Sequence, residues 1–394
     1  VSLSVVLLII GALVYLVFMG DLRRMLIPSV GWSGEDPLLL IGPAFALLVF
    51  AYAWSTERLH MNSPLAIWIS ALMGIMVFQM FNPRQGGLVV GVAGALFYLV
   101  PLLWYWIGRT YATPDYLRQI LFSVVVPLGV LATAFGLYQT FYGLLPYQEL
   151  WVDIAASPYL LGSEGIEKPF SFFASPTEHD NFILSALAVL VATLIYRRQY
   201  SLLLFILPMM AAIFLGGSRG PVLKLLVTGA GLWAVIGTNT FTWIARGLFA
   251  LVIGVVGLSW SLSAVDVGGA NERVQYRFER QQQGVAEVGA QGGSAANHVN
   301  MIVYGYVQGV TAPLGSGLGS TTKAGAKYGG VSKSTEADSS DLFQSTGLAG
   351  GAVYLIILFL IIRSALQYWL EARSLLALCI AGVLAINFFL WLMG

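Results

Sequence analysis

Long apolar runs alternate with short polar stretches along most of this chain. A helix that crosses a bilayer needs ~20 mostly apolar residues, because lipid offers no hydrogen-bonding partner to the backbone. Strands of a membrane barrel would instead alternate in polarity over ~10 residues, and these runs are too long and too continuous for that. Eleven runs fit the helical pattern: 2–19, 37–54, 64–81, 87–108, 119–143, 181–196, 202–217, 221–236, 246–264, 346–363 and 374–394.

The pattern therefore predicts an all-α polytopic membrane protein, organised as one membrane domain over residues 1–394. We expect about 11–12 transmembrane helices, by the length that a spanning helix requires. Eleven crossings would leave the two chain ends on opposite sides, which is why a twelfth helix is also expected.

Basic residues in the short connections predict the orientation, because Lys and Arg are more frequent on the cytoplasmic side. If the runs alternate, one side receives Arg58, Arg109, Arg118, Arg197, Arg198, Arg246, Arg363 and Arg373. We assign that side to the cytoplasm, so the two long connections 144–180 and 265–345 lie outside. Arg23 and Arg24 would also lie outside, against this rule. Either that bend is structured or the first run is miscounted.

The composition narrows the class of protein. Hydrophobic residues make up 58% of the 394 residues, charged residues make up 10%, and the mean hydropathy is +0.79. A soluble domain carries roughly 25% charged residues, so a water-soluble surface is excluded. The net charge of +1 gives no bulk attraction to nucleic acid, and the single cysteine, Cys379, excludes an intramolecular disulfide. Of the 20 basic and 19 acidic residues, 13 lie in the outer connection 265–345.

Three arginines in that connection form the first candidate site. Arg273, Arg277 and Arg280 are spaced i, i+4, i+7, which places them on one face of a helix. Guanidinium groups match phosphate oxygens in bidentate geometry, so this face is a candidate anion site. The alternative is a surface helix whose arginines pair with Glu272 and Glu279.

A second candidate lies in Gly216–Pro221, which joins two apolar runs with almost no connection. This places Arg219 at or just inside the outer interface, where a charge is costly and usually functional. Lys224 follows less than two helical turns later and can reach the same surface. The alternative is an interfacial arginine whose side chain simply extends to water.

A third candidate is the acidic stretch Ser334–Asp341, just before the helix expected from near Thr346. A carboxylate at the mouth of a membrane cavity is a candidate general base, and Glu336 and Asp338 are the candidates here. Acidic residues ahead of a helix are also favoured by its dipole, which is a sufficient structural explanation. Glu336 and Asp338 match a D-x-D metal motif only loosely.

Two outer segments and the histidines give weaker signals. Pro313–Ser320 is rich in glycine but follows no strand, so a tight turn is expected rather than a nucleotide site. Lys168–Asp180 contains aromatic side chains that line a sugar site or lie at the interface. His60, His179 and His298 are scattered, so we expect no metal site and no cofactor.

Four short motifs follow one another between about residues 140 and 365. They are Lys168–Pro176, similar to R-x-F-S-x-F-x-S-P; Gly217–Gly220, similar to an S-R-G turn; Ala312–Gly319, similar to P-L-F-G-x-G-x-G; and Glu336–Gly350, similar to H-N-x9-G-x-x-G with Gly347 and Gly350 on its glycines. In this order, around one large outer connection, they resemble the O-antigen ligase and O-antigen polymerase superfamily of bacterial envelope glycosyltransferases.

The chain departs from the family pattern at three positions. Glu336 stands where ligases carry His, which resembles exopolysaccharide polymerases more than ligases. The family's arginine ahead of P-L-F-G falls near His298 or Asn300, so that contact is not carried over. Lys168 stands where many relatives have Arg, which keeps the charge but loses the bidentate fork.

The resemblance implies a polysaccharide polymerase of the bacterial inner membrane with its active site on the periplasmic face. It implies metal-independent, inverting transfer from an undecaprenyl-diphosphate-linked glycan to a lipid-linked acceptor, in a type C glycosyltransferase architecture. A chain-length regulator is a further expected partner. The implied diphosphate ligands are Arg219, Arg277, Arg280 and Arg273. Glu336 is the implied base, with Asp338 second. Sugar or loop contacts are expected from Lys168, His179, His298, Asn300 and Asp341.

Two other functions stay open at this point. A ligase that transfers a finished glycan to a lipid A core or to a protein would use the same chemistry. A lipid-linked oligosaccharide flippase or transporter would carry polar residues near the bilayer midplane and two related halves. Here the ionisable residues gather toward the predicted outer rim, and no duplicated halves are visible.

Overall fold

The computed structural model describes residues 3–31, 36–56, 58–59, 62–155, 166–237, 239–286, 294–330 and 332–394. Within these ranges the regular structure is helical and no strand occurs. Every one of the eleven predicted runs coincides with a helical segment. These segments are α1 (Leu3–Val30), α2 (Leu38–Ser55), α3 (Pro64–Gln79), α4 (Leu88–Tyr111), α5 (Pro114–Ile120) continued by the π-helix η2 (Leu121–Val125) and α6 (Val126–Tyr142), α8 (Pro176–Arg197), α9 (Leu203–Leu215), α10 (Arg219–Val235), α11 (Thr240–Ala264), α15 (Asp338–Ala372) and α16 (Leu375–Met393).

The two long connections also contain helices. These are α7 (Pro146–Ala155), α12 (Glu272–Ala286), α13 (Ser294–Thr311) and α14 (Lys323–Lys327). Two short 3-10 turns, η1 (Pro83–Gln85) and η3 (Tyr200–Leu202), precede α4 and α9. Residues 156–165 and 287–293 of the connections lie outside the described ranges.

Eight of the described segments are long and apolar enough to cross a membrane: Val5–Val30, Leu38–Ser55, Leu88–Tyr111, Pro114–Tyr142, Pro176–Arg197, Thr240–Ala264, Asp338–Ala372 and Leu375–Met393. Pro64–Gln79 and Tyr200–Leu215 are shorter apolar helices, and α10 has 17 residues. The architecture is therefore that of a multi-pass membrane protein. The structure supports eight candidate crossings where the sequence predicts 11–12.

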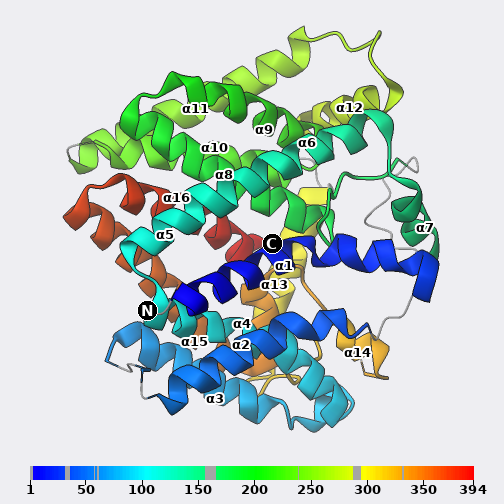
Figure 1. Cartoon of the computed structure of the whole chain (residues 1–394), viewed down its shortest axis with the longest axis vertical. Helices are drawn as coiled ribbons and strands as arrows, with labels where there is room; N and C mark the ends of the chain where they lie inside the picture. Colours follow the sequence, from blue (N-terminus) through cyan, green and yellow to red (C-terminus); the bar gives the residue numbers. More distant parts are fainter. Residues whose placement is uncertain are drawn as a thin grey trace. The chain divides into compact units, whose positions relative to one another are not determined.

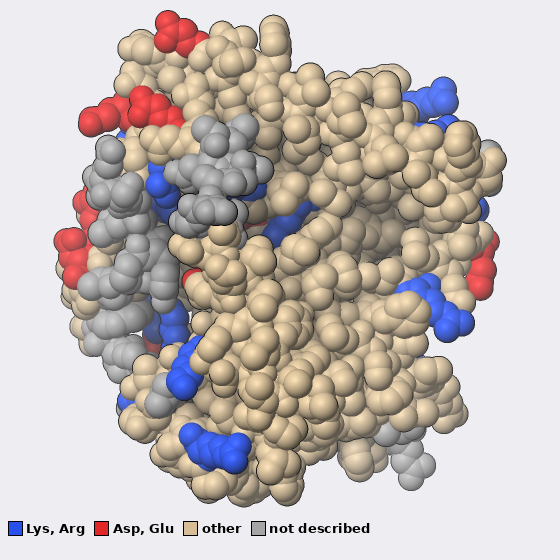
Figure 2. Space-filling view, turned by 180° about the vertical axis from the view of Figure 1, so that it is seen from behind, with Lys and Arg blue, Asp and Glu red and all other residues tan. Residues whose placement is uncertain are grey.

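The surface has the character expected in lipid. Figure 2 shows that Lys, Arg, Asp and Glu form only a few separate patches on the face that it draws. Large apolar side chains of the helices are exposed, such as Leu48 of α2 and Phe78 of α3. Extended apolar surface is unfavourable in water but matches the hydrocarbon of a bilayer.

The helices form two compact units. Unit 1 comprises residues 1–39, 114–288 and 368–387, and unit 2 comprises residues 40–113, 289–367 and 388–394. Each unit has a buried apolar core of its own, described below. The single membrane domain expected from the sequence stays a prediction.

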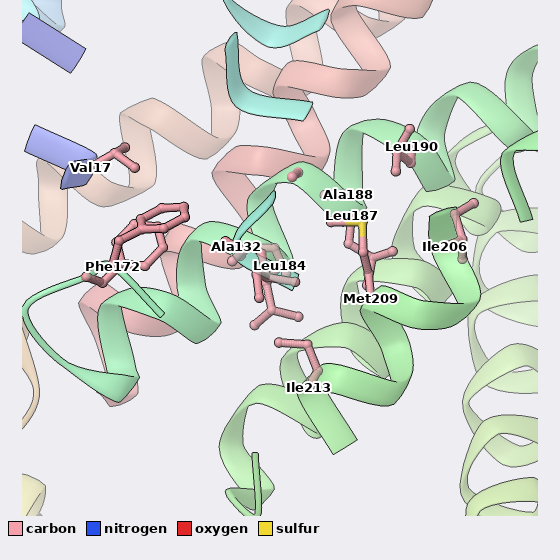
Figure 3. Packing of buried hydrophobic residues seen from close by; sticks show 14 residues of the cluster. Val17, Ala132, Phe172, Leu184, Leu187, Ala188, Leu190, Ile206, Met209 and Ile213 are labelled. Atoms are coloured by element: carbon pink, nitrogen blue, oxygen red, sulfur yellow. The ribbon is translucent and has the colours of Figure 1, made fainter. Parts of the chain in front are cut away.

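Helix α8 is the central element of unit 1, with α6, α9 and α10 packed against it (Figure 1). Figure 3 shows Leu187 of α8 close to Met209 of α9, in a cluster that also contains Ala132 of α6. Small residues let the backbones approach: a Cβ added to Gly129 of α6 would lie 2.4 Å from the Cβ of Ala186. Packing through small residues is the usual way for helices to associate in a membrane.

Unit 2 is built around α3, α4 and the first part of α15. Its core contains Leu72 of α3, Trp106 of α4 and Leu358 of α15, all at most 3% exposed. Gly347 interrupts α15 with a φ of 74°, in the left-handed region that glycine adopts without strain. This kink separates the acidic N-terminal part of α15 from the longer part of α15 that follows Gly347.

The conflict over Arg23 and Arg24 is resolved by the length of α1, which continues to Val30. The first run, 2–19, is thus too short, and both arginines lie within the helix rather than in an outer bend. Arg23 forms an ion pair with Asp36 at 2.8 Å, and Arg24 is buried inside unit 1. Basic residues that are held by structure in this way do not report orientation.

Candidate functional site

Helix α12 carries the three arginines, as their spacing predicts, and Arg277 is its buried member. Its Nη1 donates a hydrogen bond to the Leu215 carbonyl (2.9 Å) and its Nη2 to the Glu167 carbonyl (2.7 Å). Its Nε is buried and has no hydrogen-bond partner in the described part of the chain. The two carbonyls fix the guanidinium plane, but they do not neutralise its charge.

A pocket lies beside this guanidinium. It is lined by Ile166, Glu167, Lys168, Gly216, Gly217, Tyr276, Arg277 and Arg280. Arg280 and Lys168 are half-buried, and neither forms a hydrogen bond or an ion pair with another described residue. The pocket, called here the arginine pocket, therefore holds an excess of positive charge.

The state of charge of Arg277 fits this site. Burial, with a smaller contribution from Arg273, lowers the pKa of Arg277 to about 10. A guanidinium with that pKa is still protonated at neutral pH, so it carries its full charge in the pocket. The cost of keeping this charge buried is reduced when an anion binds next to it.

Arg273 has a different role from Arg277. Its Nη1 lies 2.8 Å from Oε2 of Glu167, and its guanidinium packs against Gly143. Glu272 and Glu279 are exposed and form no ion pair with the arginines of α12 in the described structure. The alternative in which the arginines pair within their own helix is therefore wrong. Because Arg273 neutralises Glu167, the acid that lines the pocket does not cancel its positive charge.

Arg219 lies at the short junction between α9 and α10, but it is not among the residues that line the arginine pocket. It is the first residue of α10 and is half-buried. The preceding Gly217 has a φ of 73°, which the tight turn requires. Lys224 is buried in α10, with its Nζ 3.4 Å from Oδ1 of Asn181. Lys224 thus interacts inside unit 1 instead of extending to the surface.

The segment that carries Lys168 is held by glutamine side chains of unit 1. Oε1 of Gln139 accepts hydrogen bonds from the backbone N–H groups of Phe170 (3.0 Å) and Ser171 (2.7 Å). Nε2 of Gln139 donates to Oε1 of Gln148 at 3.0 Å. Ser171 has a φ of 51°, so its backbone is strained and depends on these bonds. Gln139 and Gln148 therefore hold in place the segment whose Lys168 lines the arginine pocket.

Arg24 and Asp21 complete this support, and neither is among the site residues predicted from the sequence. The guanidinium of Arg24 packs against the rings of both Trp151 and Phe170, 4.2 and 4.3 Å from their centres. Its Nη2 donates to the Phe173 carbonyl. Asp21 accepts from Nε2 of Gln148 at 3.1 Å. The basic pair that contradicted the predicted orientation was the available signal for this buried network.

His179 contacts neither Lys168 nor the arginine pocket. It is fully buried in α8, where its Nδ1 lies 3.0 Å from Oδ1 of Asp180 and its ring packs on Gly136. A Cβ on Gly136 would lie 2.5 Å from Nε2 of His179, so the glycine makes room for the ring. Its ring also lies edge to face with Phe173 of the outer segment, 6.1 Å between centres, so His179 contacts that segment, and a contact to sugar stays a prediction.

The acidic stretch in unit 2 separates into two kinds of carboxylate, and Asp341 is the structural kind. It is buried and accepts hydrogen bonds from the backbone N–H of Thr335 (2.6 Å), from Oγ1 of Thr335 (2.8 Å) and from Oγ of Ser334 (2.8 Å). These bonds close the turn ahead of α15 and use three of the roughly four acceptor positions of the carboxylate, while the residue is only 5% exposed. A contact to sugar is not what its geometry favours.

Glu336 is the second kind of carboxylate, which is exposed. Its side chain is 67% exposed, and its φ of 67° places a non-glycine residue in the strained left-handed region. Oε2 of Glu336 lies 3.4 Å from Nδ1 of His298 on α13. Asp338 begins α15 and is partly buried, and Asn300 lies exposed on α13. The structure thus brings His298 to Glu336, while Asn300 makes no hydrogen bond among the described residues.

The glycine-rich segment forms the tight turn that the sequence predicts. Gly315 and Gly317 have φ values of 69° and 98°. The N–H of Gly317 donates to the Ser345 carbonyl at 3.0 Å, and the Pro313 carbonyl accepts from the N–H of Leu348 at 3.2 Å. The turn is therefore fixed against the kink in α15 and supports the acidic stretch in unit 2.

No three His, Cys, Asp or Glu side chains of the described residues gather as metal ligands. His60 lies outside the described residues. The sequence matches no protein-family model and no curated protein at a significant level.

Proposed function

We propose that this protein is a membrane glycosyltransferase that polymerises lipid-linked glycan units. In this proposal an undecaprenyl-diphosphate-linked glycan is the donor and a second lipid-linked glycan is the acceptor. The protein then works in the bacterial inner membrane, with its reaction on the outer face and a type C glycosyltransferase architecture. The four motifs that resemble the O-antigen polymerase superfamily motivate this choice of substrates.

The observation that carries the proposal is the buried Arg277 beside Lys168 and Arg280, which have no partner among the described residues. When the sugar–phosphate bond breaks, negative charge develops on the leaving diphosphate, and fixed cations stabilise it. Arg277 is already oriented by two carbonyls, so it needs no reorganisation when that charge appears. Its buried, unpaired Nε offers a further donor to a phosphate oxygen.

The size of the arginine pocket limits how the diphosphate binds. The cavity is about 20 Å³, which is enough for one water-sized group. In this conformation it accepts a single phosphate oxygen, so we expect the rest of the diphosphate to remain at its mouth. There the flexible Lys168 and Arg280 side chains close on it. Arg219 then serves the same anion only after a rearrangement of the Gly216–Gly220 turn.

Glu336 is the proposed general base. It accepts the proton of the attacking acceptor hydroxyl while that oxygen bonds to the anomeric carbon and the diphosphate leaves with the bond's electron pair. This single displacement inverts the anomeric configuration. The strained backbone of Glu336 supports the assignment, because strain at a non-glycine residue is commonly retained at functional positions. Cations at the diphosphate provide the charge stabilisation without a divalent metal.

The test is polymer formation by the purified protein from lipid-linked repeat units. We expect Glu336→Gln to lower the polymerisation rate by about 10²–10⁴-fold, the usual contribution of a general base. Donor affinity should stay unchanged. Glu272→Gln on α12 is the matched control, because Glu272 is also an exposed glutamate. Full polymer formation by Glu336→Gln would remove Glu336 as the base.

A ligase is the second candidate, because a histidine, His298, lies beside Glu336. Ligases of the resembled superfamily carry His at the position of Glu336. The acceptor separates the two functions: a ligase transfers the glycan to a lipid A core or a protein, whereas a polymerase uses a second lipid-linked unit. Offering both acceptors to one preparation identifies which product forms.

A further inference from the structure

A second and larger cavity in unit 1 has no part in the proposed reaction. It has a volume of about 450 Å³, within the range of roughly 300–1,000 Å³ that is typical of ligand pockets. Three helix ends meet there: the start of α5, the end of α8 and the start of α16. Helix ends of apolar segments lie at the boundary between hydrocarbon and headgroups.

Two arginines from different helices line this cavity. Arg118 of α5 lies 3.2 Å from Asp115, but both side chains are mostly exposed, so the pair is weak. Arg197 of α8 forms no hydrogen bond or ion pair with another described residue. The cavity therefore contains at least one uncompensated guanidinium, and a second that can leave its partner at little cost.

The first turn of α16 adds hydrogen-bond donors. Leu375 and Leu376 line the cavity, and the first N–H groups of a helix have no acceptor within that helix. Ser374 caps the turn, with its Oγ 3.3 Å from the N–H of Ala377. The N-terminal end of a helix favours an anion, and here it acts on the same space as the two arginines.

The rest of the lining is apolar and includes an irregular helix. Phe122 and Ser123 belong to η2, a π-helical turn between α5 and α6. Such turns are rare and are often found at functional sites. Phe122 and the two leucines of α16 give the cavity an apolar side, which suits a ligand that carries both a charge and a hydrocarbon part.

We propose that this cavity binds a phosphate group, presented by the headgroup of an anionic phospholipid or by free phosphate. The guanidiniums of Arg118 and Arg197 and the first turn of α16 hold the phosphate oxygens. In a lipid, the acyl chains lie along Phe122 and Leu376. Basic pockets between membrane helices on the cytoplasmic side are suited to such headgroups. The site is independent of the proposed glycan transfer.

The experiment measures binding to the purified full chain in detergent. The probes are short-chain phosphatidylglycerol, short-chain phosphatidylcholine and inorganic phosphate, and the readout is bound ligand by native mass spectrometry. The test variant is Arg118→Gln with Arg197→Gln. The control is Arg363→Gln, an exposed arginine outside the cavity and on the same predicted side.

Phosphatidylglycerol should bind the wild type and the Arg363→Gln control with the same affinity. It should bind the double variant about 30-fold more weakly, since each basic residue contributes about 1 kcal/mol. Phosphatidylcholine should not bind. Inorganic phosphate that binds with the same dependence on the two arginines identifies free phosphate as the ligand. Equal phosphatidylglycerol affinity in the double variant and the wild type overturns the proposal. The proposal is also overturned if neither phosphatidylglycerol nor inorganic phosphate binds the wild type. Equal unfolding temperatures without ligand show that the double variant is folded.

Discussion

The arginine pocket of unit 1 and the acidic stretch Ser334–Asp341 of unit 2 place charge in opposite ways. Arg277 is buried and held by two carbonyls, whereas Glu336 is exposed and held by a strained backbone. The charge of Arg277 is expensive to bury, so the surrounding structure must fix it. The charge of Glu336 is hydrated because its side chain is exposed. The strained backbone at this residue therefore serves only to direct the side chain. The difference predicts that mutation of the fixed Arg277 damages folding and binding together, while mutations at Glu336 separate activity from stability.

Arg277→Ala is expected to have the largest effect. It leaves the partly buried carbonyls of Leu215 and Glu167 without this donor and removes the central cation. We expect the free energy of unfolding to fall by about 2–4 kcal/mol. Donor affinity should fall as well. Thermal unfolding in detergent and binding of undecaprenyl diphosphate measure the two quantities.

Arg280→Ala provides the control within the same pocket. Arg280 has no partner in the described structure, so its loss should weaken donor binding with little change in unfolding temperature. Equal loss of stability in Arg277→Ala and Arg280→Ala would contradict the difference between a fixed and an unpaired cation.

Asp341→Ala tests whether the buried carboxylate of the acidic stretch is structural. It removes the acceptor of three hydrogen bonds from Ser334 and Thr335. Each lost bond to a charged group costs about 1.5–3 kcal/mol, and partial replacement by water reduces the total, so we expect about 2–3 kcal/mol of destabilisation. Asp338→Ala at the start of α15 is the matched control, because it removes another aspartate of the same stretch. An unfolding temperature of Asp341→Ala equal to that of the wild type would show that its three bonds are not needed.

Glu336→Gly should have the smallest effect on stability, with the opposite sign. Glycine relieves about 1–2 kcal/mol of left-handed strain and costs about 0.5–1 kcal/mol of chain entropy, so the net gain is about 0.5 kcal/mol. Polymer formation should nevertheless be lost with the carboxylate. A variant that is both less stable and inactive would mean that Glu336 supports the fold rather than the reaction.

The helices of this protein could be predicted well from the sequence, and the contacts of the charged residues could not. All eleven apolar runs are helical because hydrophobic length is a local property. The arginine spacing on α12 was also readable, since a helix repeats every 3.6 residues. The spacing alone could not distinguish the buried Arg277 from the half-buried Arg273 and Arg280. That distinction depends on which other segments lie against each position.

The sequence by itself determined a lipid-solvated helical protein with its few charges concentrated near the predicted outer face. Only the tertiary structure decided which of those charges are fixed, paired or free. The acceptors of Arg277 lie 62 and 110 positions away along the chain, and that of Arg24 lies 149 positions away. No local pattern specifies such partners. They are selected because a buried charge must find hydrogen-bond partners among whatever segments the apolar packing brings beside it.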